Sequence, residues 1–245
     1  MSPALIAVAI VLAGAHASRP VFARGGRGRK DPDAERKGSR FLLGAGNFLI
    51  HWFMWAIGPV ERGLLRIGAT PDHMNAGGRI FGVLRGVLIA LGHLEAGGWA
   101  IALAGVCDIL DGRLARGQGL ASPYGKFIDS TLDRFVETFA FLGFAVYFGG
   151  QTLGSLVVAA GLGGSLLVSY AQARGETVGV SGSGGLMQRA ERLVLQILAC
   201  LFDPTISRAM GWEEGTVLLG VLSLIAVASM GTAIYRTIWI ALKLK

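Results

Sequence analysis

The stretch Asp108-Ile109-Leu110-Asp111-Gly112-Arg113-Leu114-Ala115-Arg116, followed after eight residues by Gly125 and then by Asp129 and Asp133, decides how the rest of the chain is interpreted. Its four aspartates form two pairs, spaced i,i+3 and i,i+4, and both spacings place a pair on one face of a helix. The flanking segments are apolar. An intramembrane aspartate costs about 2.5–3.5 kcal/mol on insertion scales, so four together require compensating charge. Clustered carboxylate oxygens suit Mg²⁺, Ca²⁺ or Mn²⁺, and the stretch therefore predicts a cation site.

Composition indicates an integral membrane protein. The chain of 245 residues is 52% hydrophobic and only 16% charged, with mean hydropathy +0.55, whereas soluble domains are about 25% charged. The net charge of +7 is expected in basic cytoplasmic loops of a membrane protein. Nucleic-acid binding is not favoured, because no aromatic residues interleave with the basic residues of the N-terminal linker. Cys107 and Cys200 each lie in an apolar segment and predict no disulfide framework.

Six apolar segments predict six transmembrane helices in an all-α fold: 75–94, 99–115, 124–148, 153–174, 187–202 and 216–242. The loops expected between them include 95–98, 149–152, 175–186 and 203–215. Basic residues gather in the loops 113–126 and 174–192 and at the C-terminal tail, whereas the opposite loops contain only Arg208 as a cation. The positive-inside rule therefore places the aspartates and the C-terminus on the cytoplasmic side of the inner membrane.

The N-terminal part of the chain is expected to be organised differently. Residues 1–40 combine a short apolar segment, 2–17, with a basic linker, 19–40. The apolar segment is interpreted as a retained hydrophobic segment, with a signal sequence or an over-extended start as the alternatives. Residues 41–70 predict an amphipathic interfacial helix, because they combine a Trp-rich apolar face with arginines and are interrupted at Gly58-Pro59, which argues against a span. Residues 71–245 form the predicted transmembrane domain.

The two aspartate pairs are expected to face each other. The short, turn-forming loop 117–123 makes the two helices antiparallel neighbours. This arrangement predicts a carboxylate cage for two cations at the membrane boundary, and two metal ions about 3.5–4 Å apart are the standard clamp for displacement at phosphorus. Gly112 and Gly125 remove side chains where a ligand or a second helix approaches, and Arg116 supplies positive charge for a phosphate.

The stretch resembles the signature of the CDP-alcohol phosphotransferase family, D-x₂-D-G-x₂-A-R-x₈-G-x₃-D-x₃-D, at every specified position. The resemblance extends over the six-span region from about residue 67 onward. It implies a homodimeric membrane transferase that binds CDP-diacylglycerol, uses Mg²⁺ or Mn²⁺ and releases CMP when an alcohol hydroxyl attacks. Phospholipid synthesis is the implied process, with the site facing the cytoplasm.

The resemblance also implies roles for individual residues. Asp108, Asp111 and Asp129 would be metal ligands, and Asp133 would be the general base for the hydroxyl and also a contact to the second metal. The nucleotide site would be lined by residues of the same signature: Asp108, Asp111, Gly112, Ala115, Arg116, Ser122 and Gly125. Ser122 has a competing interpretation as a helix cap, because Pro123 follows it at a first helical position.

The acceptor alcohol is less narrowly specified. The stretches 65–72 (LRIGATPD), 169–176 (SYAQARGE) and 188–193 (QRAERL) resemble phosphatidylinositol phosphate synthases within the family. That likeness implies inositol phosphate as acceptor, with its phosphate bound by Arg174, Gln172, Arg192 and Arg236. Gln172 stands where that subfamily usually has lysine, so glycerol 3-phosphate stays open as the acceptor.

Two function classes remain open on the residues alone. The first is the membrane transferase. The second is a cation channel or transporter that uses the aspartates as its ion site. Such a site belongs near the bilayer midplane beside broken helices, whereas these acids lie toward one membrane face beside arginines suited to phosphate, which favours the transferase.

Overall fold

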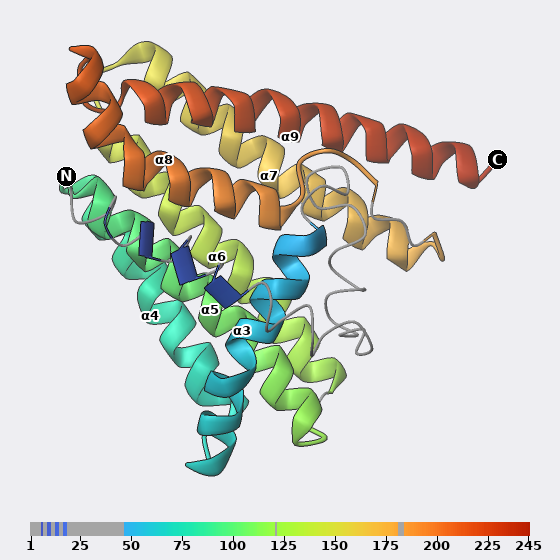
Figure 1. Ribbon diagram of the computed structural model, residues 1–245. Coiled ribbons are helices and arrows are strands. Elements are labelled where there is room, and N and C mark those ends of the chain that lie inside the picture. The colour runs from blue at the N-terminus through green and yellow to red at the C-terminus, as the bar shows by residue number, and fades with distance from the viewer. Residues whose placement is uncertain are drawn as a thin grey trace. The chain divides into compact units, whose positions relative to one another are not determined.

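The structure, a computed structural model, describes residues 6, 9–10, 13–14, 17–18, 47–120, 122–180 and 184–245. Over the long described ranges, all regular secondary structure is α-helical, which confirms the all-α prediction. Seven helices occupy these ranges (Figure 1): α3 (Asn47–Arg66), α4 (Pro71–Ala90), α5 (Leu94–Gly117), α6 (Pro123–Tyr147), α7 (Thr152–Thr177), α8 (Arg189–Met210) and α9 (Thr216–Lys243). The predicted linker 19–40 and most of the segment 2–17 lie outside the described residues.

One predicted loop is helical and a second is partly helical. Residues 95–98 belong to the first turn and a half of α5, because the chain turns earlier, at Gly92 with φ 83°. Glu95 in the first turn of α5 interacts favourably with the helix dipole. At the other end, α8 continues beyond residue 202 and passes through Pro204 to Met210, where Gly211 ends it in the left-handed conformation. The predicted interruption at Gly58-Pro59 is also wrong, since α3 runs through Pro59.

The chain divides into two compact units, one comprising Met1–Met74 with Leu110–Leu120 and the other comprising Asn75–Ile109 with Ala121–Lys245. In the smaller unit, α3 packs against the last turns of α5: Arg113 Nε donates to Glu61 Oε2 at 2.6 Å, and Gln118 Nε2 donates to the Ala69 carbonyl at 2.9 Å. The end of α5 is thus fixed by polar contacts within its own unit.

The larger unit holds the apolar core. The core residues come from six helices, α4 to α9, and include Ile89, Ile101, Phe141, Phe144, Val158, Cys200, Leu222 and Ile225. Helices α7 and α9 lie side by side along much of their length (Figure 1), and Gly164 permits this approach, since an added Cβ there would lie 3.0 Å from Met230 N. Gly143 of α6 likewise faces the Gly86 backbone of α4 so closely that a Cβ would collide with it. Small residues at helix crossings are the packing device typical of helices in lipid.

Three described helices are long and apolar enough to cross a membrane, namely α7, α8 and α9. The other helices at the predicted spans are α4, α5 and α6, and they have comparable lengths of 20, 24 and 25 residues. Charged side chains interrupt these three helices: α5 and α6 carry the four aspartates, and α4 carries Arg79 and Arg85.

Candidate metal centre

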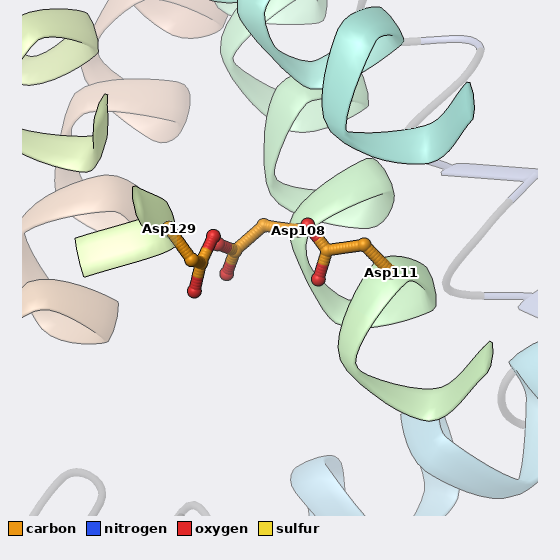
Figure 2. A group of neighbouring side chains, drawn as sticks. All are labelled: Asp108, Asp111 and Asp129. Carbon is orange, nitrogen blue, oxygen red and sulfur yellow. The ribbon is translucent and has the colours of Figure 1, made fainter. Parts of the chain in front are cut away.

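Three aspartates from two helices come together. Asp108 and Asp111 lie three residues apart on the continuous helix α5, and Asp129 lies on α6 in the same compact unit as Asp108. One carboxylate oxygen of each lies within 4.8 Å of the others. Figure 2 shows the three side chains and the helices that carry them. Asp111 is buried, with 7% of its surface exposed, and the other two are half-buried.

This arrangement fits a divalent cation. Three carboxylates brought this close repel one another unless positive charge lies between or beside them. Oxygen atoms are the ligands that Mg²⁺, Ca²⁺ and Mn²⁺ prefer, and a mixed contribution from two helices is a common way to hold such an ion. The structure therefore brings together the three residues predicted as metal ligands.

Asp133 lies outside this group of three and pairs with Arg189 at the start of α8. Arg189 Nη2 donates to Asp133 Oδ1 at 2.5 Å, and Arg189 Nη1 makes a short contact with Asp133 Oδ2. Arg189 Nη1 also donates to Asp108 Oδ1 at 3.3 Å. The guanidinium thus binds Asp133 through both oxygens while touching one member of the three-aspartate group.

Sequence reasoning missed Arg189 because it selected Arg192 from the same stretch. The two arginines are three residues apart in the first turn of α8, so they lie on neighbouring positions of one face. The signal that could have found Arg189 was its location at a predicted cytoplasmic helix end, since Asp108 and Asp133 were expected at the same membrane boundary.

The predicted nucleotide residues occupy the last turns of α5 and the first turn of α6. Arg116 is exposed, and its guanidinium lies over Gly112, where an added Cβ would be 3.3 Å from Nη1. Ala115 is half-buried and Gly125 is exposed. Ser122 is the N-cap of α6, since its Oγ accepts from Gly125 N at 3.1 Å, and this confirms the cap interpretation.

Two predicted acceptor arginines are buried and bound to protein groups. Arg192, 1% exposed, donates from Nε and Nη2 to Glu137 Oε1 at 3.0 and 2.8 Å. Arg236, 3% exposed, donates to three neutral oxygens: the Gly184 carbonyl at 2.7 Å, the Val168 carbonyl at 3.0 Å and Gln172 Oε1 at 2.9 Å. Gln172 and Arg236, both predicted for the acceptor site, are therefore in direct contact.

Arg174 lies elsewhere. It is exposed and lines a cavity of about 530 Å³ between the C-terminal halves of α7 and α9. The other lining residues are mostly apolar and include Leu167, Met230, Ile234 and Ile238. Gln172, Arg192 and Arg236 do not line this cavity, so the structure does not bring Arg174 together with them there.

Comparison with known proteins gives a consistent result. Residues 74–227 match the family model described as CDP-alcohol phosphatidyltransferase. The phosphatidylinositol phosphate synthase of Mycobacteroides abscessus is 36% identical over 69% of this chain and 79% of its own length. The corresponding synthase of Streptomyces avermitilis is 34% identical over 76% of this chain and 78% of its length.

Solved structures agree with the sequence relatives. The Mycobacterium tuberculosis phosphatidylinositol phosphate synthase, crystallised with CDP-DAG bound, matches with a TM-score of 0.64 and 30% identity over 74% of this chain and 92% of that one. A second crystal structure of that synthase, in complex with manganese and citrate, matches with a TM-score of 0.65 over 74% of this chain and 88% of that one.

Proposed function

The chain belongs to the CDP-alcohol phosphatidyltransferase family and is a transferase, and on this premise we propose that it transfers a phosphatidyl group from CDP-diacylglycerol to a phosphorylated alcohol, with inositol phosphate favoured. CMP is the other product. The observation that carries the proposal is the group formed by Asp108, Asp111 and Asp129 with Asp133 beside it. The donor is supported by the tuberculosis synthase that binds CDP-DAG.

Asp108, Asp111 and Asp129 would hold Mg²⁺ or Mn²⁺, in a two-metal site if Asp133 joins them. When bound, these cations neutralise the donor's pyrophosphate and the charge that develops on departing CMP. The relative that binds manganese supports this assignment. Arg116, exposed at the end of α5, would contact a donor phosphate. Gly112, Ala115, Ser122 and Gly125 would complete the nucleotide site.

Asp133 would act on the acceptor. Its carboxylate takes the proton of the acceptor hydroxyl while the hydroxyl oxygen forms a new bond to the phosphorus that bears the lipid. The bond from that phosphorus to the bridging oxygen of the pyrophosphate breaks, and CMP leaves with the electron pair. Arg236 and Arg192 are the proposed cations for the acceptor's phosphate.

Glycerol 3-phosphate is the second candidate acceptor. The observation that favours it is Gln172, a neutral amide that accepts from Arg236 at 2.9 Å. A neutral side chain at this position leaves one cation fewer for a phosphate than a lysine would provide.

The membrane arrangement that we propose has six spans, α4 to α9, with α3 as the interfacial helix. Beyond the three strongly apolar helices, α4 exposes Ile80, Val83, Leu84 and Val87, and α6 exposes Phe135, Phe139, Leu142 and Val146. These spacings form continuous apolar faces, which soluble proteins rarely leave uncovered. The basic helix ends support a site on the cytoplasmic side of the inner membrane. A homodimer is part of the proposal.

A cation channel or transporter is less well supported. In the helices that bear the aspartates, Asp108 and Asp111 lie near the end of α5, and Asp129 and Asp133 lie near the start of α6. Both helices are continuous, whereas transporter sites at the midplane are typically built from broken helices.

The test is an acceptor panel. Purified protein with CDP-diacylglycerol and Mg²⁺ or Mn²⁺ is offered inositol phosphate, glycerol 3-phosphate, inositol and serine, and CMP release and lipid mass are measured. Release that requires a phosphorylated alcohol and stops with EDTA is expected. Turnover with glycerol 3-phosphate alone would replace the favoured acceptor, and full turnover in Asp133→Asn would rule out Asp133 as the base.

A further inference from the structure

The cavity between the C-terminal halves of α7 and α9, here called the α7–α9 groove, has no role in the proposed function. The two helices run in the same direction and pack against each other within the larger compact unit (Figure 1). Large apolar side chains that line the groove stay 46–55% exposed, among them Leu167, Ile234, Ile238 and Leu244. A contiguous apolar surface of this kind marks a place where another apolar molecule binds.

The groove has the shape and the depth of a lipid chain. Its α9 residues recur every three or four positions from Met230 to Leu244, so they form one face of the helix. At about 1.5 Å per residue, this face is about 21 Å long. The hydrocarbon of one leaflet is about 15 Å deep. Both helices are apolar enough to cross a membrane, and in the proposed arrangement their C-terminal halves lie in the cytoplasmic leaflet.

The groove carries a positive charge at its cytoplasmic end. Among the described residues that line it, Arg174 in the last turn of α7 is the only charged one, and it is exposed. In the described part of the chain, Arg189 and Arg192 pair with carboxylates, whereas Arg174 has no carboxylate partner. Glu176, two residues further along α7, accepts from Gln172 Nε2 at 3.3 Å. The Arg174 guanidinium is therefore available to a phosphate.

Neighbouring residues place Arg174 at the depth of lipid headgroups. Tyr170 lines the groove one turn before it, and on α9 Lys243 Nζ lies 5.9 Å from the centre of the Trp239 ring. These residue types gather at the boundary between membrane and water. A second copy of the chain matches the charge poorly, because the last turns of α5, α7 and α9 contribute the basic residues Arg116, Arg174 and Lys243. An apolar chain with an anionic head matches both parts of the groove.

We propose that the α7–α9 groove binds an anionic phospholipid of the cytoplasmic leaflet, with an acyl chain along the apolar walls and the phosphate on Arg174. Basic pockets between transmembrane helices bind anionic headgroups in this way. The inference goes beyond the proposed function and uses only its membrane arrangement. The bound lipid is neither donor nor product, since Gln172, Arg236 and the aspartates do not line the groove. A ligand held by two helices of the folded state stabilises that state by mass action.

The first test measures thermal unfolding of the full-length protein, freed of lipid in an uncharged detergent, without donor, acceptor or divalent cation. At about tenfold above its Kd, dioctanoyl-phosphatidylglycerol should raise Tm by about 3–6 °C more than dioctanoyl-phosphatidylcholine does. Arg174→Gln should abolish this difference, and Arg174→Lys should keep part of it. Arg208→Gln, at an exposed position in the last turn of α8, is the matched control and should keep all of it. Equal shifts with the two lipids in the native protein, or the full difference in Arg174→Gln, overturn the proposal.

The second test asks whether the apolar walls take part. Ala241→Trp fills the groove at an exposed position and leaves Arg174 in place, so the extra shift with phosphatidylglycerol should disappear. Inorganic phosphate at the same concentration should leave Tm unchanged. A full lipid shift in Ala241→Trp, or an equal shift with inorganic phosphate, would refute a lipid site. Conversion of a native dimer to a monomer by Ala241→Trp, seen by size exclusion, would assign the groove to a second copy instead. None of these measurements needs turnover, so a protein that releases no CMP would refute the proposed function and leave the lipid site to be judged separately.

Discussion

The acidic groups at the two ends of helix α8 differ in how their negative charge is balanced. Near its C-terminal end, Asp203 is fully buried and accepts from Gly215 N at 2.6 Å, Leu218 N at 2.9 Å and Ser207 Oγ at 3.3 Å. At its N-terminal end, Arg189 meets Asp108 and Asp133 beside a group of carboxylates that face one another. Asp203 is satisfied by fixed donors, which fits a structural cap of α9, whereas the other acids face further negative charge.

The arginines show the same contrast. Arg192 and Arg236 are almost fully buried, and Arg189 is partly exposed. Arg192 donates to the Glu137 carboxylate, whereas the hydrogen bonds of Arg236 go to neutral oxygens. A buried guanidinium whose hydrogen bonds all go to neutral groups can still attract a ligand of opposite sign.

The largest expected effect on turnover is at the N-terminal end of α8, where the aspartates face one another. Asp129→Asn keeps the shape of the side chain and removes one negative charge from the three-aspartate group. CMP release should fall about 10²–10³-fold, because one ligand to the catalytic cation is weakened. The neighbouring Ser130→Ala, whose exposed hydroxyl donates only to the Phe127 carbonyl, should stay within twofold and serves as the control. Native turnover in Asp129→Asn would contradict a role of the three-aspartate group in turnover.

Near the C-terminal end of α8, Asp203→Asn should lower the stability of the protein and leave its turnover intact. Asparagine has one acceptor oxygen, so the Gly215 or Leu218 amide loses its partner in a buried site. The free energy of unfolding should fall by about 1–3 kcal/mol, measured as a lower Tm in detergent. Turnover per folded molecule at low temperature should remain near native. The exposed Glu213→Gln in the same loop should leave Tm unchanged, and a specific loss of turnover in Asp203→Asn would contradict the structural assignment.

A smaller effect is expected at the contact between Gln172 and Arg236. Gln172→Lys adds a cation beside the Arg236 guanidinium, whose hydrogen bonds go to neutral oxygens. If the acceptor's phosphate binds there, its KM should fall about threefold to tenfold while kcat changes less. Gln172→Met, neutral and of similar size, is the control and should not lower KM. A lower Tm with an unchanged KM would show that Gln172 only holds Arg236 in place.

The smallest effect is expected for Arg174→Gln. Arg174 is exposed and lines the apolar cavity between α7 and α9, which Arg236 does not line. The KM for the phosphorylated acceptor should therefore change by less than about twofold, whereas Arg236→Lys should raise it more strongly. A large rise in KM for Arg174→Gln would return this residue to the acceptor site.

The helices themselves were largely predictable. Five of the six predicted spans end within a few residues of the observed helices, because apolar segments in this chain are separated by glycine, proline and charged residues. The exception at α8 is instructive: Asp203-Pro204 is typical of a turn, yet Asp203 accepts amides of α9 and the helix continues to Met210. A contact with a residue twelve positions away overrides the local signal.

The sequence by itself determined the class of the protein and the identity of its acids. Hydropathy predicted α-helices able to cross a membrane, and the spacing of Asp108, Asp111, Asp129 and Asp133 on two neighbouring helices predicted a cation site. Both are properties of residue types at short separations, which local geometry converts into structure without further information.

Only the tertiary structure decided which charges are already compensated. Arg189 and Asp133 are 56 residues apart, Arg192 and Glu137 are 55 apart, and Arg236 and Gln172 are 64 apart. Whether a given arginine pairs with a carboxylate, a carbonyl or nothing depends on helix packing, and a shift of one helical position exchanges one partner for another. Electrostatic partners at such separations are set by the fold as a whole, and with them the roles of otherwise similar side chains.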